Sequence, residues 1–316
     1  MSTSIPLHHM VKRSEIMYNK KSSLKRLKEE FMFKVVKKVQ LAPETFSLDI
    51  LAPRVAKSAL PGQFVILIAD KYAERVPLTI SDYNLEEGTV QVVIQAIGPS
   101  TQKLAKVEEG EEIESFVGPL GRPSDFTSED PASLKEKKVL FVGGGLGAAP
   151  VYPQAKWFHA HGYSCDVIIG GKSKDYIILE DKMREVADQV YPCTDDESYG
   201  FHGVVTDCLK DLVQKGNHYD HVVAIGPMIM MKFVCLLTKE LNIPTTVSLN
   251  PIMVDGTGMC GACRCTVEGK TRFACVHGPE FDGHQVDFDE AMKRQRQYAD
   301  VEKGKGCALG KEASRD

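Results

Sequence analysis

Residues 138–162, KVLFVGGGLGAAPVYPQAKWFHAHG, predict an apolar strand, a glycine-rich turn and a helix in direct succession. Further buried strands and one more helix are indicated downstream by CDVIIGG (165–171), HVVAIGP (221–227), TTVSLN (245–250) and, for the helix, FVCLLTKELN (233–242). Strands that alternate with helices form a parallel sheet with helices on both faces. We therefore predict a doubly wound α/β domain over residues 134–250.

Two glycine-containing turns of this domain are candidate nucleotide sites. The first opens the helix that follows the first strand, where free N–H groups and the positive end of the helix dipole can bind a pyrophosphate. The second follows HVVAI, at the carboxyl end of a strand, where open α/β sheets bind their ligands. The alternative for each is a tight turn without a ligand. The residues concerned are Gly143, Gly144, Gly145, Leu146 and Gly147 in the first turn, and Gly226, Pro227 and Met228 in the second.

The choice between NAD(H) and NADP(H) stays open. The acidic residue that usually binds the adenosine ribose, about twenty positions after the glycines, is not obvious here, because the next strand ends in Gly170-Gly171-Lys172. Lys172 and Lys174 are placed to contact a 2′-phosphate, whereas Glu180 and Asp181 favour an unphosphorylated ribose.

The part of the chain before this domain has a different pattern. Residues 32–127 contain short β-branched runs separated by turn residues, which are typical of an antiparallel β-domain. The six runs are FKVVKKVQL, TFSLDIL, QFVILIA, VPLTISD, TVQVVIQAI and EEIESFV. Short strands at regular spacing predict a small closed barrel, because closure leaves no exposed edge. The polar stretch from Thr127 to Lys138 is predicted to be the linker, and the basic residues 1–31 an extension, most simply a loosely ordered tail.

The barrel contains two phosphate-binding or flavin-binding candidates. Arg75 offers a guanidinium that can bind phosphate through two nitrogens, and Thr79, four residues later, offers a hydroxyl to a flavin ring nitrogen. Gly98-Pro99-Ser100-Thr101 is a second turn able to bind phosphate. A plain barrel strand is the alternative for the first of these motifs.

A candidate metal centre lies after the α/β domain. Asp255, Cys260, Cys263 and Cys275 have the spacing D-x4-C-x2-C-x11-C, which resembles a plant-type [2Fe-2S] loop whose first cysteine is an aspartate. Glycines between them allow a tight wrap around an inorganic core. Two alternatives remain: Cys265 in place of Asp255, and a structural zinc site that also uses His277 and His284.

Composition sets the class of protein. At 316 residues and 43% hydrophobic content, the chain is long enough for two or three globular domains. Nine cysteines, an odd number, fit a reducing compartment, so we expect a cytoplasmic protein. A net charge of −4 argues against nucleic-acid binding, and no apolar run approaches the ~20 residues that span a membrane.

The order of these modules resembles one branch of a known superfamily. A flavin barrel, a sheet with G-G-G-x-G-A-A-P and G-P-M-x-M-M, and a [2Fe-2S] loop are found in the ferredoxin-NADP reductase superfamily branch with the dihydroorotate dehydrogenase electron-transfer subunit. The resemblance covers Met32 to about Asp289. Within this branch, NPIMVDGTGMCGACR and GPEFD are similar to the small subunit of NADH-dependent reduced ferredoxin:NADP oxidoreductase, a bifurcating transhydrogenase, and to the sulfide dehydrogenase subunit.

The resemblance implies a fold of the β + α/β type. It consists of an antiparallel FAD-binding β-barrel, a doubly wound parallel-sheet nucleotide domain, a small [2Fe-2S] module over residues 251–288, and a C-terminal helix and tail over 289–316. It also implies the contacts of each cofactor, with Thr79 near flavin N5. FAD would contact Arg75, Pro77, Leu78, Thr79, Val93, Ile94, Gln95, Ser100 and Thr101; NAD(H) would contact Gly143 to Gly147 and Gly226 to Met228; Asp255, Cys260, Cys263 and Cys275 would hold the cluster.

The function implied by the resemblance is that of an electron-transfer subunit. Hydride would pass between nicotinamide and flavin, and single electrons would pass through the cluster to a larger partner that carries a second flavin and [4Fe-4S] clusters. Ferredoxin would take part only through that partner. The alternatives are a dihydroorotate dehydrogenase electron-transfer subunit and a sulfide dehydrogenase, or polysulfide reductase, subunit.

Overall fold

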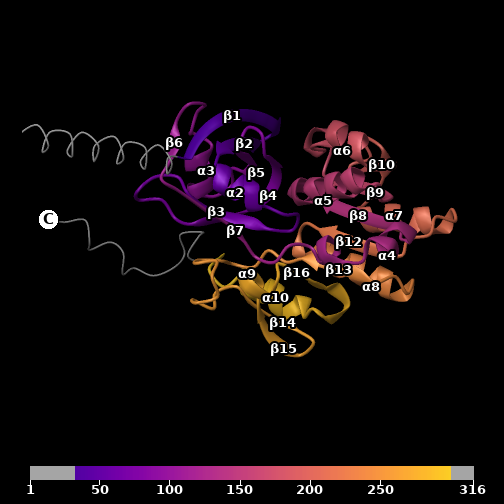
Figure 1. Ribbon diagram of the computed structural model, residues 1–316. Helices are drawn as coiled ribbons and strands as arrows, with labels where there is room; N and C mark the ends of the chain where they lie inside the picture. Colours follow the sequence, from indigo (N-terminus) through magenta and orange to yellow (C-terminus); the bar gives the residue numbers. More distant parts are fainter. Residues whose placement is uncertain (1–32, 300–316) are drawn as a thin grey trace, which may run out of the picture.

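A computed structural model describes residues 33–299 of the chain. The extension predicted for residues 1–31 and the end of the C-terminal tail lie outside the described residues. Three modules are visible in Figure 1: a β-barrel, an α/β domain beside it, and a small C-terminal module below both. Among the described residues, no helix is long and apolar enough to cross a membrane.

The first module is a seven-stranded antiparallel sheet in the order β6-β1-β2-β5-β4-β3-β7. The two end strands, β6 and β7, are separated by Glu114 alone, so the sheet curls into a nearly closed barrel. All six predicted runs are strands, and EEIESFV is divided between β6 and β7. The elements are β1 (Phe33–Ala42), β2 (Thr45–Leu51), α2 (Pro53–Ser58), β3 (Phe64–Ile68), β4 (Val76–Asn84), β5 (Thr89–Gln95), α3 (Pro99–Leu104), β6 (Glu112–Ile113) and β7 (Ser115–Leu120).

The second module confirms the predicted α/β fold. Its sheet has the order β11-β10-β9-β8-β12-β13-β16, and its strands are parallel except β16. The predicted linker contains η1 and α4. The elements are η1 (Asp125–Ser128), α4 (Pro131–Glu136), β8 (Val139–Gly144), η2 (Gly145–Gly147), α5 (Ala148–His161), β9 (Cys165–Gly171), η3 (Lys174–Tyr176), α6 (Glu180–Val186), β10 (Gln189–Thr194), β11 (Phe201–His202), α7 (Val205–Gln214), β12 (His221–Ile225), α8 (Met228–Glu240) and β13 (Thr245–Ser248).

The third module is joined to the second through their hydrogen-bonded strands. Its elements are β14 (Arg264–Val267), β15 (Lys270–Phe273), α9 (Ala274–His277), β16 (Glu280–Asp282), η4 (Gly283–Gln285) and α10 (Phe288–Gln295). β16 pairs with β13 and extends the α/β sheet by one antiparallel strand. An ion pair between Lys232 Nζ and Asp289, 2.7 Å apart, joins α8 to α10. The C-terminal module is therefore fixed to the nucleotide domain rather than held by a linker.

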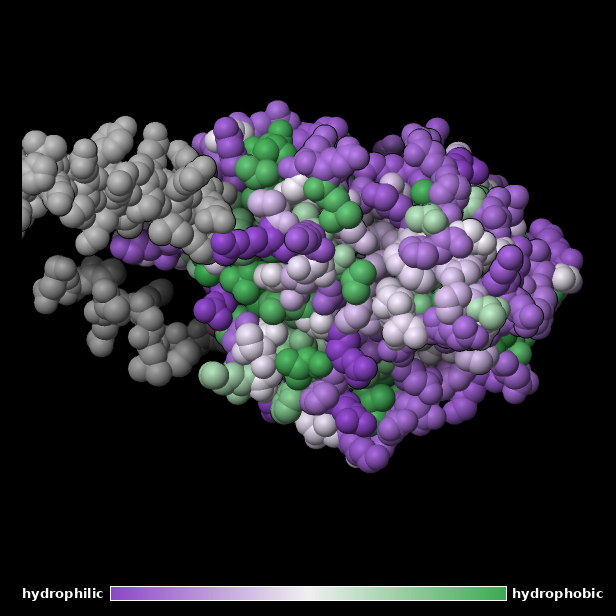
Figure 2. All heavy atoms as spheres, in the orientation of Figure 1, coloured by the Kyte–Doolittle hydropathy of each residue, from purple (hydrophilic) through white to green (hydrophobic). Residues whose placement is uncertain are grey.

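The surface differs between the modules. Figure 2 shows hydrophilic residues over most of the α/β domain, whereas hydrophobic residues gather over the barrel and the C-terminal module.

Candidate functional site: an iron–sulfur loop on a flavin barrel

The loop that contains Asp255 is closed by its own carboxylate. Asp255 accepts hydrogen bonds from the backbone N–H of Thr257 at 2.8 Å and of Cys260 at 2.7 Å. These donors, that of Thr257 first, hold the pKa of Asp255 below its usual value. Gly256 and Gly258 adopt φ of +74° and +85°, which residues with a side chain rarely adopt. The carboxylate therefore lies next to Cys260, on the same turn of the loop.

The cysteines of the predicted cluster lie around this loop. Cys263 and Cys275 are buried, and their sulfurs are 3.1 Å apart. Cys260 is exposed at the mouth of the loop. Backbone N–H groups point at two of the sulfurs, from Ala262 to Cys260 at 3.4 Å and from Cys275 to Cys263 at 3.5 Å. Such donors suit thiolates that carry the negative charge of an iron–sulfur centre.

Burial controls when the Cys275 thiol ionises. It raises the pKa of Cys275 to about 12, assisted by the hydrogen bond with Cys263. The proton therefore leaves only when a metal ion replaces it, as is usual for a thiol that becomes a ligand.

The structure separates Cys265 from the other cysteines. Cys265 is on β14, and its side chain belongs to the core formed with Val267, Phe288 and Ala291. Its thiol faces the carbonyl oxygen of Arg272 at 3.8 Å. Cys263 and Cys275 belong to a different apolar cluster.

The two histidines of the zinc alternative are also engaged elsewhere. His277 Nδ1 accepts from the backbone N–H of Phe273 at 3.0 Å, and His284 Nε2 contacts the hydroxyl of Thr238 at 3.0 Å. Within residues 33–299, no three His, Cys, Asp or Glu side chains are placed to hold a single metal ion. A two-iron core needs its four protein ligands spread more widely than the ligands of a single metal ion, with two ligands at each iron. The geometry favours the iron–sulfur interpretation over a zinc site.

The loop rests on one strand of the barrel. Cys263 and Cys275 pack in a cluster with Phe64 and Ile66 of β3. A methyl group added at Gly256 would lie 2.6 Å from Cδ1 of Ile66, so the loop backbone approaches β3 as closely as glycine allows. Sequence analysis did not single out Phe64 or Ile66, because in the sequence they are ordinary apolar residues of a strand.

β3 also pairs directly with β4, the strand of the predicted flavin motif. Phe64 lies opposite Thr79, Val65 opposite Leu78 and Ile66 opposite Pro77. The strand that carries the flavin candidates is thus separated from the cysteines by the width of a single strand.

β4 changes its partner half-way along. Val76 to Thr79 pair with β3, whereas Ile80 to Asn84 pair with β5. Val93, Ile94 and Gln95 consequently pair with β2 only, among the described strands. We call this point, between Thr79 and Ile80, the fork of β4. The gap there between the first half of β4 and the end of β5 leaves backbone donors and acceptors available to a flat ligand.

The predicted flavin contacts of β5 are of two kinds. Val93 packs against the α/β domain, in a cluster with Phe141 and Ala148, and Ile94 lies in the barrel core. Their side chains are occupied by packing, so only their backbone edges remain for a ligand. Gln95 is half-buried at the end of the strand.

The remaining barrel candidates gather at one rim. Ser100 donates a hydrogen bond to Glu74, which precedes Arg75. Thr101 accepts from the N–H of Gly98 at 3.0 Å and so shapes the turn that opens α3. Arg75 is exposed and has no assigned ion-pair partner among the described residues. The structure thus brings the guanidinium and the Gly98 turn together.

The two glycine turns of the α/β domain also meet. β8 and β12 are neighbours, and the sheet order reverses between them, the position where open α/β sheets bind ligands. A methyl group at Gly147 would lie 1.9 Å from the carbonyl oxygen of Ile225, and one at Gly226 would lie 3.0 Å from that of Gly144. Met228 is buried, and Pro227 is exposed.

This site faces the barrel across a tight interface. Val93 and Ala42 of the barrel pack with Phe141 and Ala148, close to the glycine turn. An ion pair between Lys156 of α5 and Asp82 of β4, at 2.6 Å, fixes the same two modules. The glycine turn and β4 consequently lie at the interface between the barrel and the α/β domain, and the cysteine loop packs on the adjacent strand, β3.

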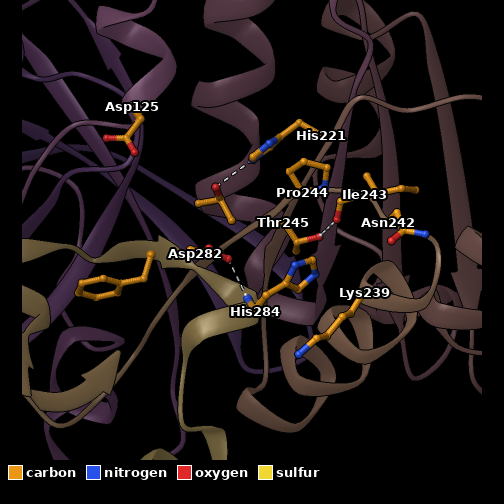
Figure 3. A pocket seen from close by; sticks show the side chains of 11 residues that line it. Asp125, His221, Lys239, Asn242, Ile243, Pro244, Thr245, Asp282 and His284 are labelled. Carbon is orange, nitrogen blue, oxygen red and sulfur yellow. Dashed lines mark hydrogen bonds between the residues drawn. The ribbon is translucent and has the colours of Figure 1, made fainter. Parts of the chain in front are cut away.

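A cavity of about 550 Å³ lies elsewhere, at the amino ends of β12 and β13. In Figure 3, His221, Thr245 and His284 point into it, with Lys239 and Asp282 at its margins. The carboxyl ends of the strands, with the glycine turns, lie on the opposite edge of the sheet. This cavity is therefore not the nucleotide site.

Comparisons with known proteins agree with this arrangement. Residues 250–287 match the family model described as the iron–sulfur cluster binding domain of dihydroorotate dehydrogenase B. The dihydroorotate dehydrogenase B (NAD(+)) electron transfer subunit homolog of Thermotoga maritima is 46% identical over 269 residues, which cover 85% of this chain and 92% of that protein. The chain belongs to the family of dihydroorotate dehydrogenase B electron-transfer subunits.

Two further relatives of this electron-transfer family are informative. An uncharacterized protein of the adh 3′ region of Clostridium beijerinckii is 58% identical over 275 residues, which cover 87% of this chain and 93% of that protein. A solved chain of the NADH-dependent reduced ferredoxin-NADP oxidoreductase is 44% identical, with a TM-score of 0.80, and covers 87% of this chain and 96% of that one. The predicted family, the reductase-like fold and the assignment as an oxidoreductase subunit are confirmed.

Proposed function

We propose that this chain transfers electrons between NAD(H), FAD and a [2Fe-2S] cluster, and that it passes them to or from a larger partner subunit. The observation that carries the proposal is the position of β3. Phe64 of this strand pairs with Thr79 of β4 through the backbone, and its side chain shares an apolar cluster with Cys263 and Cys275. The cofactor sites are thus close enough to exchange electrons without movement of a domain.

Each part of the chain has a defined task in this proposal. The turns at Gly147 and Gly226 bind the pyrophosphate and direct the nicotinamide toward the barrel. Arg75 and the Gly98 turn bind the flavin phosphates, and the fork of β4 receives the ring. Asp255, Cys260, Cys263 and Cys275 hold the iron.

The cofactors supply the redox chemistry. When bound, the flavin would supply the conversion between the two-electron hydride of NADH and the single electrons that a cluster accepts. The protein holds the reactants in place and keeps water away, since the walls between the three sites are apolar.

The ligand set can be tested by substitution. Asp255→Cys should retain the cluster and change its visible spectrum and reduction potential, whereas Cys263→Ser should lower the iron content. Cys265→Ser serves as the matched control, because its thiol lies in another core. Loss of iron in Cys265→Ser with retention in an Asp255→Ala variant would contradict the assignment.

We expect the partner to be a larger flavin and [4Fe-4S] oxidoreductase subunit. The support for this is the similarity, over nearly its whole length, to a solved chain of the NADH-dependent reduced ferredoxin-NADP oxidoreductase, a structure of flavin-based electron bifurcation. The second candidate is a dihydroorotate dehydrogenase B catalytic subunit, which the matched iron–sulfur domain favours. Expression of the chain at its natural level, followed by isolation of the intact complex and assay with ferredoxin, dihydroorotate or sulfide, separates these partners. Full ferredoxin-linked activity of the chain alone would contradict the need for a partner.

A further inference from the structure

One carboxyl group lies where all three modules meet. Glu280 is on β16, in the C-terminal module, and its Oε1 accepts two hydrogen bonds. One comes from Ser124 Oγ at 3.0 Å, at the end of the barrel, and the other from Gln154 Nε2 at 2.8 Å, on α5. Ser124 and Gln154 are fully buried, and Glu280 is half-buried, so solvent protons can reach it.

The surroundings of Glu280 favour the neutral acid. Burial first, and the nearby carboxylate of Asp125 second, raise its pKa to about 7, against the hydrogen bonds from Ser124 and Gln154, which lower it. Among the described residues, no ion pair with a basic side chain offsets this effect. A carboxyl group in this situation changes its protonation state near neutral pH.

The Gln154 amide can form a hydrogen bond with the Glu280 carboxyl in either of its protonation states. Its Nε2 donates to Glu280, while its Oε1 is buried without a partner. A half-turn of the amide would present Oε1 to the same carboxyl, which can donate an O–H when it is protonated. A buried polar atom left without a partner is unusual.

Glu280 also lies beside the strand that separates the cofactor sites. A methyl group at Gly62 would lie 3.0 Å from Glu280 Oε1, and Gly62 leads into β3. Gln63, the next residue, accepts a hydrogen bond at its carbonyl from Ile80 of β4 at 3.1 Å. The Glu280 carboxyl therefore lies beside the segment that leads to Phe64 of β3, and this segment is hydrogen-bonded to β4 one residue after Thr79. The region has a low dielectric constant.

We propose that Glu280 takes up a proton when an electron enters the path across β3, and that this compensates the added charge. The inference rests on the proposed function. One electron derived from NADH enters the path, one proton from water adds to the Glu280 carboxylate, and the local net charge stays constant. The group acts by position and charge and touches neither cofactor.

The inference predicts the sign of a pH effect. Where the carboxylate is ionised, its negative charge disfavours a further electron, so the cluster potential should fall as pH rises through neutrality. Below that window the group is neutral before and after reduction, and the potential should be level. Each tenfold rise in proton affinity on reduction corresponds to about 59 mV for a one-electron couple.

The test is a redox titration of the cluster in the flavin-loaded, iron-loaded protein on both sides of neutral pH. The cluster couple is chosen because flavin takes up protons of its own. In Glu280→Gln, which is isosteric and permanently neutral, the potential should stay at the acid level, above that of the unaltered protein at alkaline pH. Glu86→Gln, an exposed carboxylate in the β4–β5 turn, is the matched charge control.

A second variant keeps the test decisive if Glu280→Gln does not fold. Asp125→Asn removes the neighbouring charge that raises the pKa of Glu280, so the fall in potential should begin at lower pH. Equal pH profiles in unaltered protein, Glu280→Gln and Asp125→Asn would overturn this inference and leave the proposed function intact. A protein purified without flavin or iron would overturn the proposed function itself.

Discussion

The contact between the two glycine turns gives the sharpest stability prediction. Gly147 has φ of −62°, which any residue adopts, so Gly147→Ala adds a methyl group without backbone strain. That methyl group would lie 1.9 Å from the carbonyl oxygen of Ile225, whereas ordinary contact begins at 3.4 Å. The two turns must therefore move apart by about 1.5 Å, and the obstructing atom is backbone that cannot rotate away.

The loss in the free energy of unfolding can be estimated from other substitutions that add carbon atoms to a packed site. Added carbon atoms in a packed site cost roughly 1–3 kcal/mol, and we expect the upper end here, which corresponds to a fall in Tm of roughly 6–12 °C. A displacement of ~1 Å in a binding turn can also cost about 100-fold in rate or affinity. NADH should consequently bind far more weakly.

Gly144→Ala is the matched control. Its methyl group would meet Met230 Sδ at 2.2 Å, but that is a flexible side chain able to move. Thermal unfolding and NADH titration of both variants should show Gly147→Ala as clearly the worse. Equal losses in the two variants, or an unchanged Tm in Gly147→Ala, would refute the close packing of the turns.

Three further predictions follow from single contacts. Lys138→Met should cost roughly 3–5 kcal/mol in the free energy of unfolding, because it leaves the fully buried Asp166 without its cation. Lys215→Met, at an exposed helix pair, should leave the free energy of unfolding almost unchanged, and denaturant unfolding of both variants compares them. The raised pKa of Glu280 means that the folded state binds this proton more tightly than the unfolded state does. The free energy of unfolding should therefore fall by about 3 kcal/mol as pH rises from about 4.5 to about 7. A Glu280→Gln variant should lack that fall. Cys265→Ala should lower Tm through a small cavity while iron content stays unchanged, and a loss of iron would show that the thiol is a ligand.

The sequence predicts the two large folds because their signals are local. VLFV followed by glycines and a helical segment determines β8, η2 and α5, and the six β-branched runs determine the barrel. The spacing of Asp255, Cys260 and Cys263 likewise lies within one loop. Each of these features depends on neighbours in the chain, so pattern and turn chemistry are sufficient.

What the sequence did not reveal depends on distant pairing. β16 has only three residues, Glu280–Asp282, too few to predict a strand from an alternating pattern, and it becomes a strand because β13 offers an edge. The division of β4 between β3 and β5 falls inside the single run VPLTISD, with no break to mark it. The environment of Glu280 requires Ser124 and Gln154, which are more than a hundred residues away in the chain.

The most direct test is the visible spectrum of anaerobically purified protein, with flavin, iron and zinc assayed on the same sample, before and after addition of NADH. The account predicts flavin bands, about two iron atoms per chain, as a [2Fe-2S] cluster requires, and bleaching of both chromophores by NADH. A colourless protein that contains zinc would contradict it.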